Sequence, residues 1–241
     1  MRSTILFSGI LLIGFVSCEK NGFICYNGNG NIITEQRTTD HFDGIDLRIS
    51  ADVHVEQSST YSVSIAASEN LMSVIQTEVH GSTLCIDTKK NKCINGNDNI
   101  DIYVTMPELL KLDISGSGDI VSENNFIAPN LEINISGSGN ITMDSLQTNN
   151  YEMNISGSGN IKLAGTQIAS TQKTKISGSG DINTLNLPTN DCTITISGSG
   201  KAQVWAINKL NSDISGSGDV IYKGNPIVTS STSGSGDVRP Y

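Results

Sequence analysis

The chain has 241 residues, enough for one large domain or two small ones, and is 37% hydrophobic but only 5% aromatic. Its formal net charge of −9 argues against binding to nucleic acid, whose phosphates require clustered lysines and arginines. After residue 20 no segment stays apolar over the roughly 18 residues that a membrane-spanning helix needs, so such a span is excluded there.

The N-terminus has the features of an export signal. Arg2 precedes an apolar stretch, ILFSGILLIGFVS, which ends at Cys18 and is similar to a loose bacterial lipobox. In this interpretation residues 1–17 are a signal peptide, the chain is cut before Cys18, and Cys18 carries the lipid. The alternatives are an ordinary signal peptide or an apolar N-terminal strand. Residues 18–35, rich in Gly and Asn, then form a tether to the lipid of the outer membrane, on its periplasmic face or the cell surface.

Residues 36–110 are predicted to form strands. The stretches FDGIDLRIS, ADVHVEQ, YSVSIAAS, STLCIDT and NIDIYVTM alternate apolar and polar residues, which is typical of strands with one buried face. The stretch MPELLKLDIS then runs into the first repeat without a linker. We therefore expect this segment to be the N-terminal β-rich part of the same solenoid and to cover its open end.

Four cysteines remain once Cys18 is set aside, and an even number in an exported protein permits disulfides. Cys85 and Cys93 flank the turn-like segment IDTKKNK, which favours a bridge between them. Cys192 lies at an inward position and is expected to be a small buried hydrophobic residue. The chain has no CxxC motif and its three histidines lie outside the repeats, so neither a metal site nor a cofactor is expected.

From residue 111 the chain repeats the phrase SGSG seven times, at intervals of 18 to 21 residues. A fixed period of this size indicates stacked repeats. The glycines of the phrases are Gly116, Gly118, Gly137, Gly139, Gly157, Gly159, Gly178, Gly180, Gly198, Gly200, Gly216, Gly218, Gly234 and Gly236.

Each repeat reads as a strand, a corner, a second strand and a polar return. Apolar residues such as Leu112, Ile133 and Ile194 recur at the third position before SGSG. The position that follows each of them is polar, and the residue just before SGSG is apolar again in most repeats. One repeat cannot bury its apolar row alone, but stacked repeats bury a continuous column. The predicted fold of residues 111–241 is therefore an all-β, parallel, right-handed β-helix of seven coils.

The glycines of the SGSG phrases have a structural role at the corners. Glycine in a strand costs roughly 0.5–1 kcal/mol relative to alanine, so its repetition implies either a positive φ or no room for a Cβ against the next coil. The serines between the glycines can form a hydroxyl ladder. The following Asp or Asn residues can bond along the axis, with Lys201 as an interruption. A calcium site at these carboxylates is the alternative to a solvated polar corner.

The stretches FDGIDLRISADVHVEQ, ENLMSVIQTEV, GSTLCI and MPELLKLDISGSGDI, with the repeated SGSGD/N, resemble the putative auto-transporter adhesin, head GIN domain family. The resemblance covers roughly residues 38–238. It implies a secreted or lipid-anchored β-helical protein of a diderm bacterium, with an adhesin-like function. It brings no catalytic residues.

The function expected is that of a non-enzymatic structural or adhesin-like binding protein of the cell surface, with a glycan or a protein as its ligand. An enzyme acting on polysaccharide is one alternative, because many β-helices are lyases or hydrolases. It would need paired carboxylates, or clustered acids with an Arg or Lys base. Three or more acids with an arginine on one face would therefore favour it. An envelope sensor or binding protein is the other alternative.

Overall fold

The computed structural model describes residues 22, 24–96, 98–122 and 124–241. The predicted signal peptide and Cys18 lie outside these residues. The described part is almost entirely β, with one short 3-10 turn, η1 (Glu69–Leu71). It contains no helix that is both long and apolar enough to cross a membrane.

The N-terminal part consists of short strands. They are β1 (Ile24–Tyr26), β2 (Ile32–Arg37), β3 (Gly44–Leu47), β4 (Asp52–Gln57), β5 (Ser62–Ser68), β6 (Ile75–His80), β7 (Thr83–Thr88), β8 (Lys92–Ile94) and β9 (Asp101–Met106).

The repeats form the remaining strands. They are β10 (Lys111–Ile114), β11 (Asp119–Ser122), β12 (Phe126–Ile127), β13 (Asn130–Ile135), β14 (Ile141–Met143), β15 (Leu146–Gln147), β16 (Asn150–Ile155), β17 (Ile161–Ala164), β18 (Ala169–Ile176), β19 (Ile182–Ile196), β20 (Lys201–Gly216), β21 (Asp219–Lys223), β22 (Ile227–Gly234) and β23 (Val238–Pro240).

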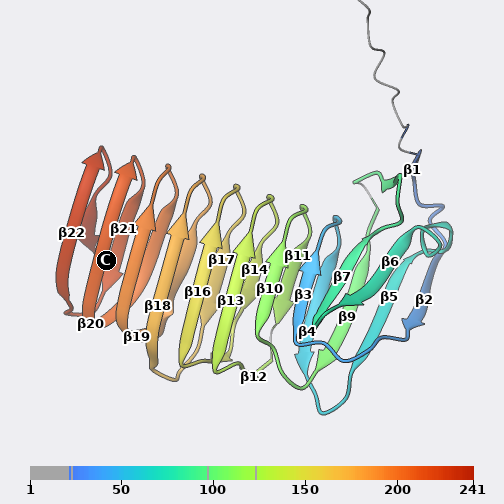
Figure 1. Ribbon diagram of the computed structural model, residues 1–241, viewed down its shortest axis with the longest axis horizontal. Coiled ribbons are helices and arrows are strands. Elements are labelled where there is room, and N and C mark those ends of the chain that lie inside the picture. Colours follow the sequence, from blue (N-terminus) through green and yellow to red (C-terminus); the bar gives the residue numbers. More distant parts are fainter. Residues whose placement is uncertain (1–21, 23, 97, 123) are drawn as a thin grey trace, which may run out of the picture.

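Two parallel sheets face each other along the stack, as Figure 1 shows. We call the strands that lead into the corners the entry sheet: β3, β10, β13, β16, β18, the C-terminal halves of β19 and β20, and β22. The strands that leave the corners form the exit sheet: β4, β11, β14, β17, the N-terminal halves of β19 and β20, β21 and β23. The predicted parallel β-solenoid is confirmed.

The SGSG repeats form about six complete turns, slightly fewer than the seven coils expected from counting phrases. Seven corners are joined by six turns, which accounts for the difference. Pairing in register places like residues on like: Leu112 lies beside Ile133, and Ile133 beside Met153. This register is what aligns the side chains of the repeats into rows.

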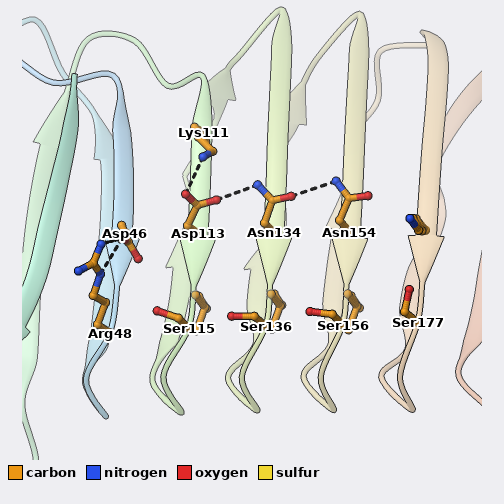
Figure 2. Close-up of a pocket in the computed structure, with 14 residues that line it drawn as sticks. Asp46, Arg48, Lys111, Asp113, Ser115, Asn134, Ser136, Asn154, Ser156 and Ser177 are labelled. Carbon is orange, nitrogen blue, oxygen red and sulfur yellow. Dashed lines mark hydrogen bonds and ion pairs between the residues drawn. The ribbon is translucent and has the colours of Figure 1, made fainter. Parts of the chain in front are cut away.

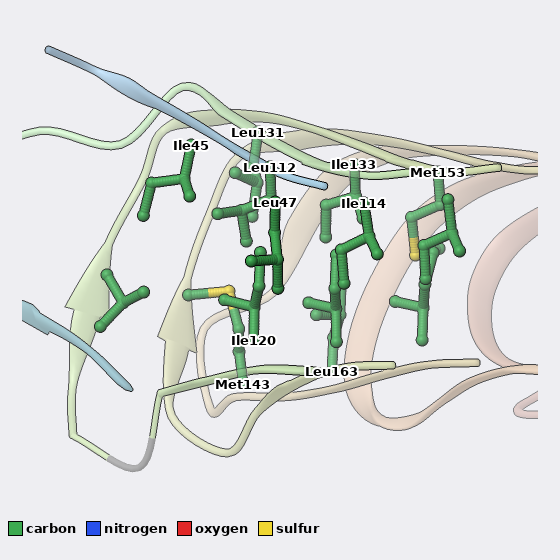
Figure 3. Close-up of a cluster of buried hydrophobic side chains, with 14 of the residues drawn as sticks. Ile45, Leu47, Leu112, Ile114, Ile120, Leu131, Ile133, Met143, Met153 and Leu163 are labelled. Carbon is green, nitrogen blue, oxygen red and sulfur yellow. The ribbon is translucent and has the colours of Figure 1, made fainter. Parts of the chain in front are cut away.

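The core lies between the two sheets (Figure 3). Apolar residues of the entry sheet face those of the exit sheet, and each is at most 1% exposed: Leu112, Ile133 and Met153 on one side, and Ile120, Met143 and Leu163 on the other. Full burial of a side chain of this size contributes roughly 1.5–3 kcal/mol. The alternation predicted from the sequence is therefore the alternation between this core and the solvent.

The N-terminal part continues both sheets. Strand β3 pairs in parallel with β10, and β4 with β11, so residues 44–57 form a further coil below the first SGSG corner. Strands β3 and β4 also pair in parallel with β7 and β9. The antiparallel strands β2, β5 and β6 then end the stack on this side.

The tether was predicted to extend to residue 35, and this boundary is wrong. Strand β2 pairs antiparallel with β5, with Ile32 opposite Ser68, and β1 pairs in parallel with β8. Both strands therefore belong to the folded domain. The Gly/Asn-rich composition concealed them because β2 supplies mainly backbone hydrogen bonds to the edge of β5, and its side chains alternate between exposed and half-buried.

Candidate functional site

The outer side of the entry sheet carries in-register rows of polar groups. Every second residue of these strands points outward, and pairing in register places Asp113, Asn134, Asn154 and Lys175 side by side. A second row, near the corners, consists of Ser115, Ser136, Ser156 and Ser177 (Figure 2). We call these two rows, together with Asp46, Arg48 and Lys111, the polar face.

A directional chain of hydrogen bonds runs along the first row. Asn134 Nδ2 donates to Asp113 Oδ1 at 2.8 Å, and Asn154 Nδ2 donates to Asn134 Oδ1 at 2.9 Å (Figure 2). Asn134 Nδ2 also lies 2.8 Å from Glu132 Oε1. Because each amide points toward the preceding coil, the carbonyl end of Asn154 points toward the next strand, where Lys175 lies in register. The chain fixes these side chains before any ligand arrives.

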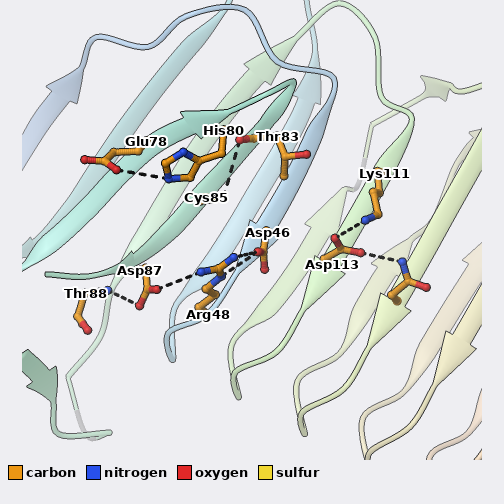
Figure 4. A network of polar contacts seen from close by, with 11 residues as sticks. Asp46, Arg48, Glu78, His80, Thr83, Cys85, Asp87, Thr88, Lys111 and Asp113 are labelled. Atoms are coloured by element: carbon orange, nitrogen blue, oxygen red, sulfur yellow. Dashed lines mark hydrogen bonds and ion pairs between the residues drawn. The ribbon is translucent and has the colours of Figure 1, made fainter. Parts of the chain in front are cut away.

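The N-terminal end of the polar face holds a cluster of paired charges. Arg48 Nη2 lies 2.7 Å from Asp46 Oδ2, Arg48 Nη1 lies 3.6 Å from Asp87, and Lys111 Nζ lies 2.8 Å from Asp113 (Figure 4). The hydrogen bond to Asp46 raises the pKa of Arg48, and the hydrogen bond to Asp113 raises the pKa of Lys111. Both cations are therefore held protonated, the opposite of what a general base requires.

The two rows border a groove of about 740 Å³ that extends from β3 to β18. An adjoining depression of about 400 Å³ on the same sheet is lined by residues that include Glu132, Glu152 and Lys173. Lys173 and Lys175 are exposed and form no ion pair with another residue that the structure describes. The polar face thus offers amides, hydroxyls and the unpaired ammonium group of Lys175 to a ligand, and Lys173 adds a second ammonium group in the adjoining depression.

The sequence did not single out the N-terminal contribution to this face. Asp46, Arg48 and Lys111 carry its charges, but Asp46 and Arg48 precede the SGSG repeats. The signal was present in the stretch GIDL (44–47), which pairs in register with the stretch KLDI (111–114) of the first repeat, with Ile45 beside Leu112 and Leu47 beside Ile114.

The corner positions require glycine because the backbones of successive coils approach each other closely there. Among the corner glycines only Gly216 and Gly234 have a positive φ, 139° and 132°. A Cβ on Gly157 would overlap the carbonyl oxygen of Gly137, and one on Gly159 would overlap that of Gly139. The second reason inferred from the sequence, lack of room, therefore holds at most corners.

The predicted hydroxyl ladder of serines is not what joins the corners. Backbone bonds do so: Ser138 N donates to Gly116 O, and Ser158 N donates to Gly137 O, each at 3.1 Å. Where the chain is described, successive corners show no serine-to-serine hydroxyl bond. The serines of the outward row are different ones, each just before the first glycine of a phrase, and their hydroxyls form no hydrogen bond with a described residue, so they remain free to contact a ligand.

The Asp/Asn row after the corners is structural. Asn160 Nδ2 donates to Asn140 Oδ1 at 2.8 Å, and Asn160 Oδ1 accepts the backbone N–H of Asp181 at 3.0 Å. Asp119 and Asp181 accept the backbone N–H of the next coil in the same way. The oxygens are thus used by the backbone, and no group of three or more metal-ligating side chains occurs among the residues with described positions.

The predicted bridge between Cys85 and Cys93 is wrong. Cys93 is bonded to Cys25, and Cys85 is a buried free thiol. The physical reason is the parallel pairing of β1 with β8, which sets Cys25 opposite Cys93, whereas Cys85 lies in β7 beside Asp46. Cys192 is buried, in agreement with the sequence, and burial raises its pKa to about 12.

A smaller hollow of about 140 Å³ lies on the exit sheet. His54 and Tyr103 stack there with ring centroids 5.0 Å apart, and His54 Nε2 lies 3.4 Å from Asp101 Oδ1. Tyr103 is 49% exposed. The sequence pattern placed these residues on strands but did not join them, because four strands, β5 to β8, separate β4 from β9 in the chain.

Comparison with known proteins gives a family and a set of related folds. The family model described as "Putative auto-transporter adhesin, head GIN domain" matches residues 41–226. A putative adhesin from Bacteroides fragilis has a TM-score of 0.84 and 26% identity, with 90% of this chain and 100% of that chain covered. A putative lipid binding protein from Parabacteroides distasonis has a TM-score of 0.76 and 27% identity, with 90% and 99% covered.

A putative adhesin from Parabacteroides merdae has a TM-score of 0.68 and 25% identity, again with 90% of this chain and 99% of that chain covered. No curated protein matches the sequence.

Proposed function

The chain belongs to the family described as "Putative auto-transporter adhesin, head GIN domain", and we propose on this basis that it is a non-enzymatic, adhesin-like binding protein of the bacterial envelope, anchored by a lipid on Cys18. The ligand binds along the polar face. The observation that carries this proposal is the groove of about 740 Å³ with its two in-register rows of amide and hydroxyl groups.

The chemistry of the groove favours a ligand rich in hydroxyl groups, such as a glycan chain lying along the stack. Such a ligand exchanges hydrogen bonds with water for hydrogen bonds with the protein, so affinity depends on donors and acceptors that are already ordered. Asn134 and Asn154 are ordered by their own chain of bonds. Repetition along the axis allows one polymer to engage several coils at once.

A glycan array and a pull-down with the purified protein test this function. We expect Lys175→Ala and Ser156→Ala to weaken ligand capture, because both residues line the groove. Lys162→Ala is the matched control, since Lys162 lies on the exit sheet, where it pairs with Asp144 at 3.0 Å. If the groove variants and the control bind equally well, the ligand does not use the polar face.

The lipid anchor is tested separately. Cys18→Ala should release the protein from membranes or block its processing, because the Cys18 sulfur is the atom to which the lipid would be attached. Labelled palmitate should enter the unaltered protein and not the variant. A protein that never incorporates palmitate would contradict the anchor without affecting the groove. The relative described as a lipid binding protein is compatible with a protein that works next to a membrane.

An enzyme acting on polysaccharide is the second candidate, and one observation favours it. Asp46, Asp87 and Asp113 gather with Arg48 and Lys111 at one end of the groove, a combination of acids and cations on one face. The raised pKa values of both cations oppose a role as base. Incubation of the bound glycan with the protein, followed by assay for new reducing ends or unsaturated products, separates the two. A product that forms with the unaltered protein but not with Arg48→Gln would establish the enzyme.

A further inference from the structure

A basic turn lies at the end of the molecule where the chain enters the fold. Lys89, Lys90 and Lys92 are three of the 15 lysines and arginines of a chain whose net charge is −9, and they fall within four positions. Lys89 and Lys90 are exposed, and Lys92 is half-buried. None of the three forms an ion pair with a residue of described position. We call residues 89–92 the basic turn.

The turn has a fixed shape. Lys92 N donates to Lys89 O at 2.9 Å, Thr88 Oγ1 donates to Lys92 O at 2.8 Å, and Asn91 adopts a left-handed conformation with φ 63°. Lys89 N donates to Val74 O at 2.9 Å, which ties the turn to the folded body. The three ammonium groups are therefore carried by a rigid support.

The first described strand is fastened to this turn. Ile24 N donates to Asn91 O at 3.1 Å, Ile24 lies in register with Lys92, and the disulfide joins the next residues of the two strands, Cys25 and Cys93. Figure 1 shows β1 at the end of the molecule opposite the C-terminal coil. Cys18 lies six residues before Ile24 in the sequence. Six residues span at most roughly 20 Å, so any lipid on Cys18 lies within that reach of Ile24 and the basic turn.

The surroundings of the turn suit an anionic, partly apolar partner. Ile24, beside Lys92, is 61% exposed, so an apolar side chain adjoins the cations. The carboxylates that precede and follow the turn most closely in the sequence are already engaged: Asp87 by Arg48 and by the N–H of Thr88, and Asp98 by the N–H of Gly28. Lysines near a membrane surface are attracted to anionic lipid headgroups, and an apolar side chain beside them can enter the interface.

We propose that the basic turn docks on anionic phospholipid headgroups and orients the anchored domain, with its N-terminal end on the membrane and its stack projecting away. This inference rests on the lipid anchor of the proposed function. Several acyl chains suffice to retain a protein on a membrane, so the turn sets orientation rather than retention. The disulfide keeps anchor and cations together, so both act on the same patch of membrane.

The test uses the acylated full chain, purified in detergent and reconstituted into vesicles of phosphatidylcholine, with or without about one third phosphatidylglycerol. A water-soluble amine reagent labels exposed lysines, which are then located by mass spectrometry. We expect labelling of Lys89, Lys90 and Lys92 to fall by about threefold or more in the anionic vesicles only, and to recover at high salt. Labelling of Lys201 and Lys209, in the distant coils of β20, should not change.

The double variant Lys89→Glu, Lys90→Glu replaces two exposed side chains and should leave the fold intact. It should still sediment with the vesicles, while Lys92 becomes as reactive in anionic as in neutral ones. The matched control is Lys201→Glu, Lys209→Glu, which should behave like the unaltered chain. Equal labelling in both vesicle types, or protection that survives in the double variant, overturns the role of the turn. A chain that stays in the supernatant with both vesicle types overturns the anchor, and the oriented docking with it.

Discussion

A carbonyl oxygen occupies the space that a side chain would need at nearly every corner of the stack. Backbone atoms of the preceding coil lie where the Cβ of Gly157 or Gly159 would be, and neither glycine has a positive φ. A rotamer change cannot relieve a clash with backbone. The two glycines of each phrase are consequently a packing requirement of the stack, and the sequence repeats them as often as the coils repeat.

We expect Gly157→Ala to lower the free energy of unfolding by roughly 1–3 kcal/mol, the usual range for overpacking, and Gly157→Val to lower it more. Gly96→Ala is the control: its Cβ would meet no atom within 4 Å, and its φ is not positive. That change should stay within about 0.5 kcal/mol. Urea melts of the three variants give the result, and similar losses at Gly157 and Gly96 would refute the steric explanation.

Asn160→Ala should cost less than the change at Gly157. It removes the acceptor of the Asp181 N–H and the donor to Asn140, and a hydrogen bond contributes about 0.5–1.5 kcal/mol net. Asn160→Asp keeps the acceptor, as Asp119 does naturally, and should recover part of the loss. The same urea melts show which of these variants loses the most stability. A larger loss at Asn160 than at Gly157 would mean that the ladder, rather than the corner, holds the coils in register.

The thiols make a separate prediction. Without reductant, iodoacetamide at about pH 8.5 should leave Cys85 and Cys192 unmodified in the native protein, because burial raises the pKa of both. In denaturant both should react, while Cys25 and Cys93 stay linked. Peptide mapping reads the outcome directly. Recovery of a Cys85–Cys93 peptide, with Cys25 alkylated, would restore the pairing inferred from the sequence.

At the scale of the element, near-identical strands create a problem of register. A slip by one whole coil places similar residues on similar residues, and the apolar rows alone oppose it weakly. The interior of β16, β18 and β19 differs from the rest because it holds a buried polar cluster. Tyr151 Oη lies 2.7 Å from Thr189 Oγ1 and donates to Gln172 Oε1 at 2.9 Å. These contacts are satisfied in a single register.

Tyr151→Phe should lower the free energy of unfolding by about 1–3 kcal/mol, because Thr189 and Gln172 lose a partner inside the core. Burial also raises the pKa of Tyr151, so its phenol stays neutral and able to donate at ordinary pH. Tyr103→Phe, at a 49% exposed residue, is the control and should change little. Denaturant melts of both variants suffice, and equal effects would deny the cluster any special role.

The elements show what the sequence could and could not predict. Alternation at Leu112, Ile133 and Ile194 predicted strands and their buried faces, because alternation records burial directly. It does not record which strand lies next to which. The pairing of β1 with β8 joins residues 68 positions apart, so both the Cys25–Cys93 bridge and the ordered start of the domain were missed. The neighbours of the repeat strands could be predicted, because a fixed period implies that each strand pairs with the equivalent strand of the next repeat.

The whole molecule is one continuous stack. Strand β10 lies between β3 and β13, so the start of the repeats at residue 111 is no structural boundary. The groove crosses this point, since Asp46 and Arg48 come from one side of it and Asn134 and Lys175 from the other. The sequence predicted the repeats' rows of polar residues but not the charged end of the site, because Asp46 and Arg48 precede the repeats whose period defines the register.

Removal of residues 1–106 tests this continuity. Circular dichroism of residues 107–241 should still show β structure, because each coil contacts only its neighbours and most neighbours remain. The cut exposes the hydrogen-bonding edge of β10 and uncovers Leu112 and Ile114, which β3 borders in the full chain. We therefore expect the fragment to associate as its concentration rises, visible by light scattering, while the full-length domain stays dispersed. A disordered spectrum with rapid, uniform proteolysis would instead show that the repeats cannot hold a stack without the N-terminal part, and a dispersed, fully stable fragment would show that β3 does not protect their edge.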